Sequence, residues 1–140
     1  MRVARVDPAS PKLAALLTWL QLEALPHDDP LPPAAGDFWW VAYDKDQPVA
    51  FAALRPSSQF SNVGYLSRCG VVPSKRGQGL QRRLLLARER FARRQGWTHL
   101  VTDTRGNPAS SNNLIRCGYR MYTPSSPWGF DDACYWIKAL

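Results

Sequence analysis

The residues with the clearest chemical potential are the two glycines of Arg76-Gly77-Gln78-Gly79, which stand between an apolar segment (65–72) and a basic helical pattern. Glycine has no Cβ atom to hold an anion away from the backbone, and the first amide N–H groups of a helix lack intrahelical partners. The helix dipole also favours negative charge at this end. The spacing therefore predicts a backbone anion site, although two glycines can also serve only to shape a turn.

The helix that follows is predicted from the spacing of its apolar residues. They recur at four, three and four residues and form one stripe: Leu80, Leu84, Ala87 and Phe91. Another face carries Arg82, Glu89 and Arg93, with the last two in the favourable i,i+4 orientation. We expect an amphipathic helix that ends at Gly96.

The loop has no Gly-Lys-Ser/Thr ending and no third glycine at the dinucleotide-fold spacing, which argues against both nucleotide motifs. Arg-x-x-Gly after a strand that ends in Val-x-Pro resembles the acyl-CoA pyrophosphate loop of the GCN5-related N-acetyltransferase (GNAT) family. The family pattern Gln/Arg-x-x-Gly-x-Gly/Ala reads Arg76, Gly79 and Gln81 here. Gln81 departs from the usual glycine or alanine, a change that removes no backbone donor.

The resemblance implies acetyl-CoA as co-substrate, direct attack of an amine on the thioester, and pantetheine lying between two splayed strands. It implies a cofactor site made of Cys69, Val71, Val72, Arg76, Gly77, Gln78, Gly79, Leu80, Gln81, Arg82, Asn107 and Ser110. A backbone N–H within residues 69–72 would meet the oxyanion. Asn107 has an equally good explanation as the N-cap of a helix that begins at Pro108.

The general acid and base depart from the family pattern. Many relatives have a tyrosine seven residues after Asn107, where Leu114 stands here, and some have a glutamate where Tyr65 stands. With a pKa of about 10, Tyr65 is better suited to relay a proton through water than to remove it, or it fills the core. The hydroxyls that could act as acid are Ser110, Ser111 and Tyr122, although each is also explained as a cap, a surface serine or a core tyrosine. The catalytic residues we predict are Tyr65, Ser111 and Tyr122.

Two loops combine carboxylates with other features that suit a cationic acceptor. One holds Asp28 and Asp29 within a proline-rich segment (26–33), and the other holds Asp131 and Asp132 beside Trp128 and Phe130. In the GNAT family the corresponding loops flank the acceptor site. The resemblance therefore implies an amine with an apolar body, while both loops are also explained as solvated surface.

The fold class expected from the pattern is α/β (mixed α+β), in a single domain over residues 1–140. The elements are strand 3–6, helix 13–25, strands 38–43 and 48–54 as a hairpin, strand 62–72, the helix after the glycine loop, strand 97–103, helix 107–118, and strands 119–123 and 133–139. We expect Gly64 to form a bulge and the crossover between strands 62–72 and 97–103 to be parallel. This order is similar to the GNAT fold, a mixed sheet of six to seven strands flanked by helices.

The net charge of +7 suggests an anionic partner, and eight of the 18 Lys and Arg residues lie between Lys75 and Arg94. A phosphorylated small molecule explains this cluster as well as nucleic acid does, and so does a solvated helix face. No helix-turn-helix or RNA-binding pattern is present, so a nucleic-acid partner is disfavoured. A catalytically silent sensor of acyl-CoA is a third hypothesis, because the usual acid and base are missing.

Cysteine usage bears on location. Cys69, Cys117 and Cys134 are odd in number and far apart, so we expect no disulfide framework and no zinc site, but reduced thiols in a cytoplasmic protein. No ligand spacing for a metal is present. The first residues lead to no signal-peptide core, and segment 13–25 is too short and polar to span a bilayer, so we expect no membrane partner. A homodimer is compatible with the sequence.

Overall fold

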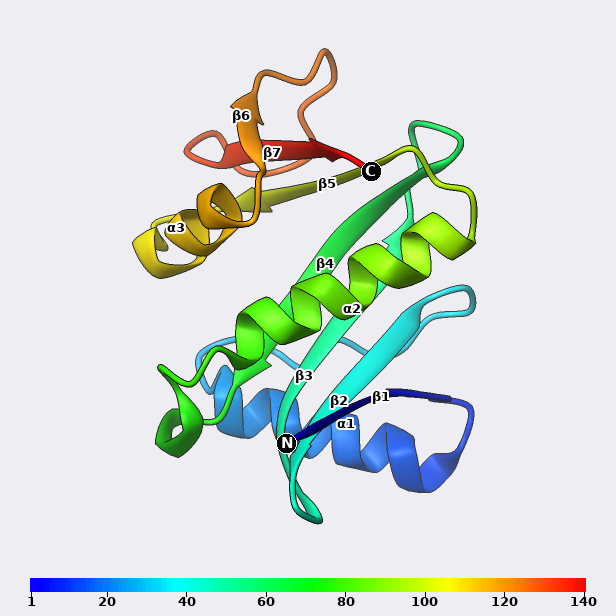
Figure 1. The fold of residues 1–140 in the computed structure, drawn as a ribbon, viewed down its shortest axis with the longest axis vertical. Coiled ribbons are helices and arrows are strands. Elements are labelled where there is room, and N and C mark those ends of the chain that lie inside the picture. Colours follow the sequence, from blue (N-terminus) through cyan, green and yellow to red (C-terminus); the bar gives the residue numbers. More distant parts are fainter. The chain divides into compact units, whose positions relative to one another are not determined.

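The computed structural model describes residues 1–140 and contains seven strands and three α-helices (Figure 1). The elements are β1 (Arg2–Val6), α1 (Pro11–Ala24), β2 (Phe38–Asp44), β3 (Gln47–Pro56), β4 (Val63–Val71), a short 3-10 turn (Pro73–Lys75), α2 (Leu80–Arg94), β5 (His99–Thr104), α3 (Pro108–Arg116), β6 (Arg120–Tyr122) and β7 (Cys134–Ala139). The strands form a mixed sheet in the order β1-β2-β3-β4-β5-β7-β6. The expected fold class and element order are confirmed.

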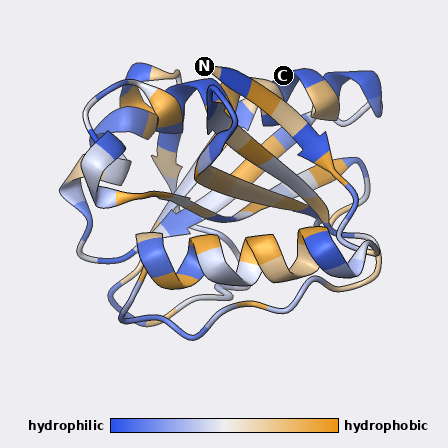
Figure 2. Cartoon of the chain, turned by 90° about the horizontal axis from the view of Figure 1, so that it is seen from below, coloured by the Kyte–Doolittle hydropathy of each residue, from blue (hydrophilic) through white to orange (hydrophobic).

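The chain divides into two compact units, and β4 and α2 contribute residues to both. The first unit comprises residues 1–55 and 67–88. In it β1, β2 and β3 pair antiparallel, and α1 packs along them (Figure 1). The buried side chains at this contact are Leu17, Leu20 and Ala24 from the helix and Trp39, Val41, Phe51 and Ala53 from the strands. Hydrophobic and hydrophilic residues alternate along the helices, as the burial of one face requires (Figure 2).

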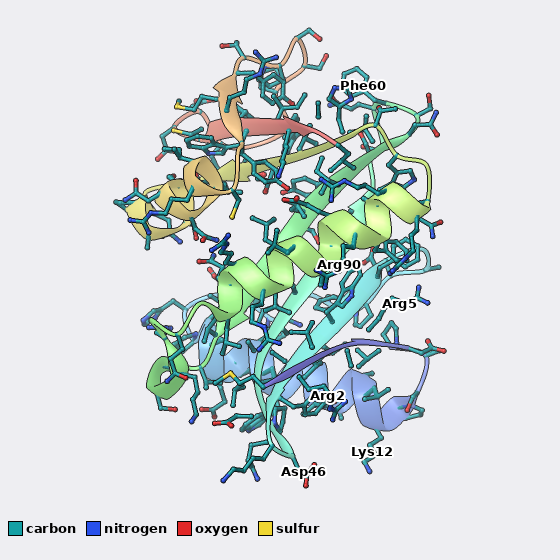
Figure 3. The ribbon with its side chains drawn as sticks, viewed as in Figure 1. Arg2, Arg5, Lys12, Asp46, Phe60 and Arg90 are labelled. Carbon is teal, nitrogen blue, oxygen red and sulfur yellow. The ribbon has the colours of Figure 1, made fainter.

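The hairpin of β2 and β3 carries the one irregularity of these antiparallel strands. The pairing register shifts between Ala42 and Tyr43, and Lys45 adopts a positive φ of 56° in the tight connection. Asp46 lies at the tip of this hairpin, and Arg2 on β1 places its guanidinium 4.4 Å from the centre of the Tyr43 ring (Figure 3). The expected hairpin is confirmed, with a bulge on β3 at Val49, which has no Cα partner on β2.

A buried glutamine fixes the proline-rich loop to the first unit. Gln21 on α1 is 1% exposed, and its amide both accepts from the Leu31 N–H at 2.8 Å and donates to the Leu31 carbonyl at 3.1 Å. The guanidinium of Arg68 donates to the same glutamine at 3.0 Å and to the Asp29 carbonyl at 2.8 Å. The Gln21 side chain thus supplies hydrogen-bond partners to the backbone of a loop in which the prolines have no N–H to donate.

The second unit comprises residues 56–66 and 89–140. In it β4 pairs parallel with β5 over Val63–Tyr65, and β7 pairs antiparallel with both β5 and β6. The predicted parallel pairing is confirmed. The register of β4 with β5 is continuous at Gly64, so the expected bulge does not interrupt this pairing. A Cβ at Gly64 would lie 2.5 Å from the ring of Trp97 and 2.8 Å from Leu100, so this glycine allows a close side-chain approach instead.

The carboxylate of Glu89 is buried in the second unit, although the sequence suggests an ordinary surface pair with Arg93. Glu89 is 1% exposed, accepts from the Tyr119 hydroxyl at 2.9 Å and pairs with the Lys138 ammonium at 2.9 Å. Arg93 lies at 3.7 Å, in the expected i,i+4 pair. The ammonium of Lys138 also donates to the Cys117 carbonyl at 2.7 Å. Several partners therefore satisfy a charge that would be costly to bury alone.

Candidate functional site

The glycine loop precedes α2 in an open conformation. Gly77 and Gly79 have positive φ values of 78° and 77°, which a side chain would strain. A Cβ at either position would meet no heavy atom within 4 Å, and residues 76–79 are exposed. The two glycines thus serve backbone conformation and access from outside, rather than close packing inside the protein.

The backbone amides at this end of α2 are not consumed by the fold. The helical ladder begins with the Arg83 N–H donating to the Gly79 carbonyl at 3.1 Å. The amides of Gln78, Gly79 and Leu80 bond to no acceptor of the chain, and no acidic residue stands in the first helical turn. Such a run of donors at the positive end of a helix dipole suits a diphosphate.

The basic side chains next to the loop hold it in place. The Arg76 guanidinium donates to the Ala24 carbonyl, at the C-terminal end of α1, at 3.1 Å and to the Val71 carbonyl at 3.2 Å. Lys75 pairs with Asp44 at 2.7 Å, and this hydrogen bond lowers the pKa of Asp44 below its usual value. The side chain of Arg76 is therefore engaged with the scaffold, and the donors of the loop that the fold leaves open are backbone amides.

The last residues of β4 lead into this loop. The Val72 N–H donates to the Val49 carbonyl at 2.9 Å, so this amide is already used. Burial raises the pKa of the Cys69 thiol above its ordinary value, against a smaller opposite effect of Arg88, and the thiol is therefore neutral at pH 7. The buried hydroxyl of Ser67 has no hydrogen-bond partner. The unpartnered hydroxyl of Ser67 and the neutral thiol of Cys69 thus both belong to β4.

A second cluster, within the second unit, is centred on Asp103 of β5. Its Oδ1 accepts from the Tyr65 hydroxyl at 2.6 Å and from the Trp128 indole N–H at 3.0 Å. The carboxyl group is half-buried, and its Oδ2 has no partner. Tyr65, predicted to be catalytic, is thus hydrogen-bonded to a carboxylate that the sequence interpretation had assigned no role.

Trp128 lies at the centre of a group of tyrosine rings around this carboxylate. The ring centres of Tyr135, Tyr65 and Tyr122 lie 4.6, 6.0 and 6.5 Å from that of Trp128. The Tyr135 hydroxyl accepts from the Gly129 N–H at 2.8 Å, which holds the loop after Trp128 against β7. We refer to Asp103 with Tyr65, Tyr122, Trp128 and Tyr135 as the Asp103 cluster.

The predicted hydroxyl acids have different surroundings. The Tyr122 hydroxyl is buried without a hydrogen-bond partner, and burial, with a smaller effect of Tyr135, raises its pKa. The Ser111 hydroxyl instead lies 3.0 Å from that of Thr104, which also accepts from the Trp136 indole at 3.0 Å. Tyr122 therefore has an uncommitted proton, whereas Ser111 belongs to a hydrogen-bonded chain.

The start of α3 is arranged as a helix cap. The Asn107 side-chain oxygen accepts from the Ser110 N–H at 3.1 Å, with Pro108 in the first turn. The cap interpretation of Asn107 is confirmed, and its side-chain NH2 group is not used by the cap. Leu114 is 7% exposed and packs as a core residue. The assignments of Asn107 and Ser110 to a cofactor stay predictions.

The acidic residues expected beside Trp128 are arranged differently. Asp132 pairs with Arg105 at 2.8 Å on the surface, and the Arg105 guanidinium lies 4.3 Å from the centre of the Phe130 ring. Phe130 is 67% exposed. The carboxylate in contact with Trp128 is instead that of Asp103. Asp103 is distant from Trp128 in the sequence, and the fold brings β5 and the Trp128 loop together.

Asp103 is the residue that the sequence interpretation missed. The available signal was a carboxylate near the end of a strand (99–104) whose apolar residues are Leu100 and Val101. Its contact with Tyr65 depends on the parallel register, which pairs Tyr65 with Val101 and so puts Asp103 two residues further along the same side of β5. That register cannot be deduced from spacing alone.

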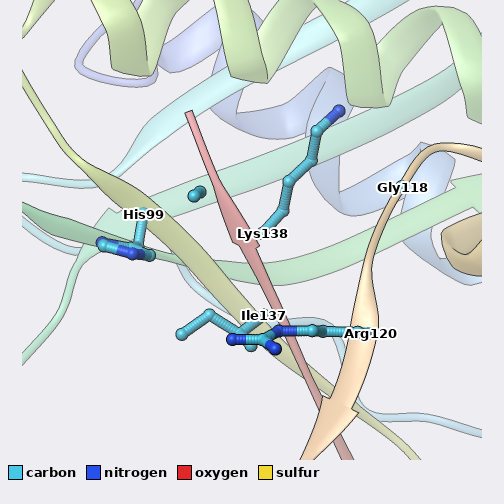
Figure 4. A pocket seen from close by; sticks show the side chains of 6 residues that line it. His99, Gly118, Arg120, Ile137 and Lys138 are labelled. Atoms are coloured by element: carbon cyan, nitrogen blue, oxygen red, sulfur yellow. The ribbon is translucent and has the colours of Figure 1, made fainter.

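A hollow of about 330 Å³ lies in the second unit, lined by His99, Gly118, Arg120, Ile137, Lys138 and Ala139. Figure 4 shows the Lys138 side chain on the opposite side of β7 from Ile137, and its ammonium is engaged with Glu89. None of the predicted site residues lines this hollow.

The three α-helices all lack the length and the apolar composition that a membrane-spanning helix needs. No group of three or more His, Cys, Asp or Glu side chains could hold a metal ion.

Comparisons with known proteins identify the family and the fold of the chain. The sequence matches the profile of the "Acetyltransferase (GNAT) family" over residues 13–119, well over half of its length. The chain therefore belongs to the GNAT family, as the glycine loop indicated. No curated protein matches the sequence significantly.

Solved structures share the fold at low sequence identity. An aminoglycoside 6'-acetyltransferase type Ii superposes with a TM-score of 0.79 at 19% identity, covering 99% of this chain and 97% of that one. The ribosomal-protein-S18-alanine N-acetyltransferase from Escherichia coli gives 0.77 at 16%, covering 99% and 92%. A Bacillus subtilis acetyltransferase in complex with CoA gives 0.75 at 14%, covering 99% and 98%. At these identities the likeness establishes the fold.

Proposed function

We propose that this protein is an acyl-CoA-dependent N-acetyltransferase that moves an acetyl group from acetyl-CoA to a primary amine of a small molecule or peptide. The observation that carries the proposal is the run of unused amides at Gln78, Gly79 and Leu80, at the start of a helix with no acid in its first turn. These donors fit a diphosphate, and membership of the GNAT family supports CoA as the molecule that carries it.

The residues that would hold the cofactor follow from these contacts. Backbone groups of residues 77–82 would bind the diphosphate, and backbone groups within residues 69–71 would bind pantetheine and supply the oxyanion donor. Val72 does not supply it in this arrangement, because its amide is bonded to Val49. One well-placed donor to an oxyanion contributes about 3–4 kcal/mol in other enzymes. Asn107 would donate through the NH2 group that the cap leaves open.

The proton transfers are assigned to tyrosines. An acceptor with a lysine-like pKa of about 10.4 must lose a proton before it attacks the thioester that acetyl-CoA supplies. We propose that this proton passes to the solvent through a water-mediated relay at Tyr65, whose hydroxyl is oriented by its 2.6 Å bond to Asp103. Tyr122 holds at its hydroxyl oxygen the proton that a departing thiolate requires. The neutral thiol of Cys69 favours direct attack over a covalent acyl-cysteine.

The test of the proposal has two parts. Calorimetry should show that acetyl-CoA binds at least about tenfold more tightly than acetyl-pantetheine, which lacks the diphosphate and the nucleoside attached to it. Thiol release from acetyl-CoA should then accelerate with at least one member of a panel of monoamines, polyamines, amino acids, aminoglycosides and peptides. Equal binding of the two thioesters would place the diphosphate away from this loop. Tight CoA binding with no turnover on any acceptor would favour the acyl-CoA sensor.

A further inference from the structure

We infer that the Asp103 cluster is the recognition site for the acceptor, and that it selects a monoamine whose single positive charge is attached to an apolar or aromatic body. The inference rests on the proposed acetyltransferase function and narrows its acceptor class. It starts from the state of one carboxylate: Oδ1 of Asp103 is held by two neutral donors, Tyr65 and Trp128, and Oδ2 has no partner.

Asp103 differs from the other partly buried carboxylates because no basic side chain of the protein pairs with it. Asp37 pairs with Arg55 at 3.3 Å, Asp44 with Lys75 at 2.7 Å, and Glu89 with Lys138 at 2.9 Å. A half-buried carboxylate without a cation is unfavourable compared with a paired one. An ammonium group of a ligand is the counter-ion that fits this position.

The surroundings of the carboxylate specify what the ammonium is attached to. The centres of three tyrosine rings lie 4.6 to 6.5 Å from the centre of the Trp128 ring, which donates to this carboxylate. Aromatic faces attract a cation and also bury apolar surface. A polyamine or an aminoglycoside would bring further ammonium groups into these aromatic surroundings, where Asp103 is the one carboxylate in contact with the rings.

The loop that supplies Trp128 is held in position from both sides. On one side the Gln59 amide donates to the Ser126 carbonyl at 3.1 Å, and on the other the Gly129 N–H donates to the Tyr135 hydroxyl at 2.8 Å. A Cβ at Gly129 would lie 3.0 Å from that hydroxyl and 3.6 Å from Oδ2 of Asp103. The glycine thus lets the loop approach the carboxylate, and a site built in advance loses less entropy on binding.

The experiment uses the full chain without cofactor and measures the binding of phenethylamine and of 2-phenylethanol by calorimetry at pH 7. The two probes share one aromatic body, and only the amine carries a charge. The substitution Asp103→Asn removes the negative charge and keeps an oxygen that can accept from Tyr65 and Trp128. We expect it to weaken phenethylamine binding by at least about tenfold and to leave binding of the alcohol unchanged.

The matched control is Asp132→Asn, which removes the same charge from an exposed pair with Arg105 and should leave phenethylamine binding unchanged. Trp128→Phe keeps a ring and loses the N–H that donates to Asp103. We expect this variant to weaken phenethylamine binding about threefold. It provides a second test if Asp103→Asn does not fold. Equal affinity of the wild type and Asp103→Asn for the amine would overturn the inference. So would equal affinity of the wild type for amine and alcohol, or no binding of the amine at millimolar concentration.

Failure of this inference is distinguishable from failure of the proposed function, because the amine is titrated without acetyl-CoA. If acetyl-CoA does not bind, the transferase proposal fails and the amine result still stands. When both ligands are present, Asp103→Asn should raise the KM for phenethylamine about tenfold and leave the KM for acetyl-CoA unchanged. A loss of acetyl-CoA affinity in this variant would contradict the recognition role.

Discussion

The glycine loop and the Asp103 cluster are built in opposite ways. The loop is one contiguous stretch, residues 76–82, whose donors are backbone amides. The cluster takes side chains from β4, β5, β6, β7 and the loop after β6, and its groups are hydroxyls, an indole and a carboxylate. A backbone site depends on the conformation of a few glycines, whereas a side-chain site depends on the identity of every residue in it.

This difference determines which substitutions should matter in each region. At the exposed residues 77–79 of the loop, a change of side chain is harmless unless it adds a Cβ at a positive φ or brings an anion next to the amides. In the cluster, removal of a single hydroxyl changes a hydrogen bond or leaves an atom unpaired. In the loop, variants with equal backbone strain can therefore be compared. In the cluster, variants with nearly equal side-chain volume can be compared.

The largest effect is expected from Gly79→Glu. The new carboxylate would repel a diphosphate at the start of α2, so CoA affinity should fall at least about 100-fold. A side chain at a φ of 77° should also destabilise the protein by about 1–2 kcal/mol. Calorimetry with CoA and a thermal melt measure the two effects separately.

The matched control is Gly96→Glu. Gly96 follows the other end of α2, also has a φ of 77°, and a Cβ there would likewise meet no atom within 4 Å. We expect a similar loss of stability and unchanged CoA affinity. If both variants lost CoA binding equally, the loss would come from backbone strain, and the diphosphate would bind elsewhere.

The sequence predicted the elements and the loop because their signals are local. The stripe on α2 predicted the burial of Leu80 and Leu84, which are 2% and 0% exposed. The two glycines predicted an open helix start, and both adopt positive φ. The cap at Asn107 followed from a polar residue before a proline. Each of these features depends on neighbours within a few residues, so one sequence contains the information.

The remaining features depend on contacts between distant segments. The contacts of Asp103 with Tyr65 and Trp128 require the parallel register of β4 with β5 and the path of the Trp128 loop. The attachment of the Arg76 guanidinium to the Ala24 carbonyl joins residues 52 positions apart in the chain. No local pattern specifies such pairs, and a glutamate on a polar helical stripe gives no sign that it is buried, as Glu89 is.

The next largest effect should come from Tyr65→Phe. This change keeps the ring beside Trp128 and removes the hydroxyl that donates to Asp103. If that hydroxyl relays the proton of the acceptor, kcat should fall by roughly 10- to 100-fold while CoA affinity stays unchanged. Steady-state thiol release at saturating acetyl-CoA measures it. An unchanged kcat would assign Tyr65 to packing alone.

A smaller effect on turnover, with the opposite sign for stability, is expected from Tyr122→Phe. The Tyr122 hydroxyl is buried without a partner, so its removal should stabilise the protein by about 1 kcal/mol and raise the Tm by a few degrees. If this hydroxyl supplies the proton to the thiolate, kcat should fall about tenfold. Tyr43→Phe, on β2 in the other unit, is the control and should change neither quantity. A stabilised variant with full activity would leave Tyr122 with no catalytic role.

The smallest effect is expected from Cys69→Ala, although Cys69 stands just before the glycine loop. If that region acts through its backbone, the variant should retain kcat and CoA affinity within about twofold.

Burial raises the pKa of the Cys69 thiol above its ordinary value of 9.0. Alkylation of Cys69 by iodoacetamide should therefore become fast only at a higher pH than in an unfolded peptide of the same sequence. The raised pKa leaves stability unchanged below pH 9 and lowers it as the pH rises further, because the unfolded chain then ionises first. Peptide mass spectrometry after timed alkylation measures the pH at which Cys69 becomes reactive. Fast alkylation at pH 7 with loss of turnover in the alanine variant would instead identify a nucleophilic thiolate, and the mechanism would then pass through an acyl-cysteine.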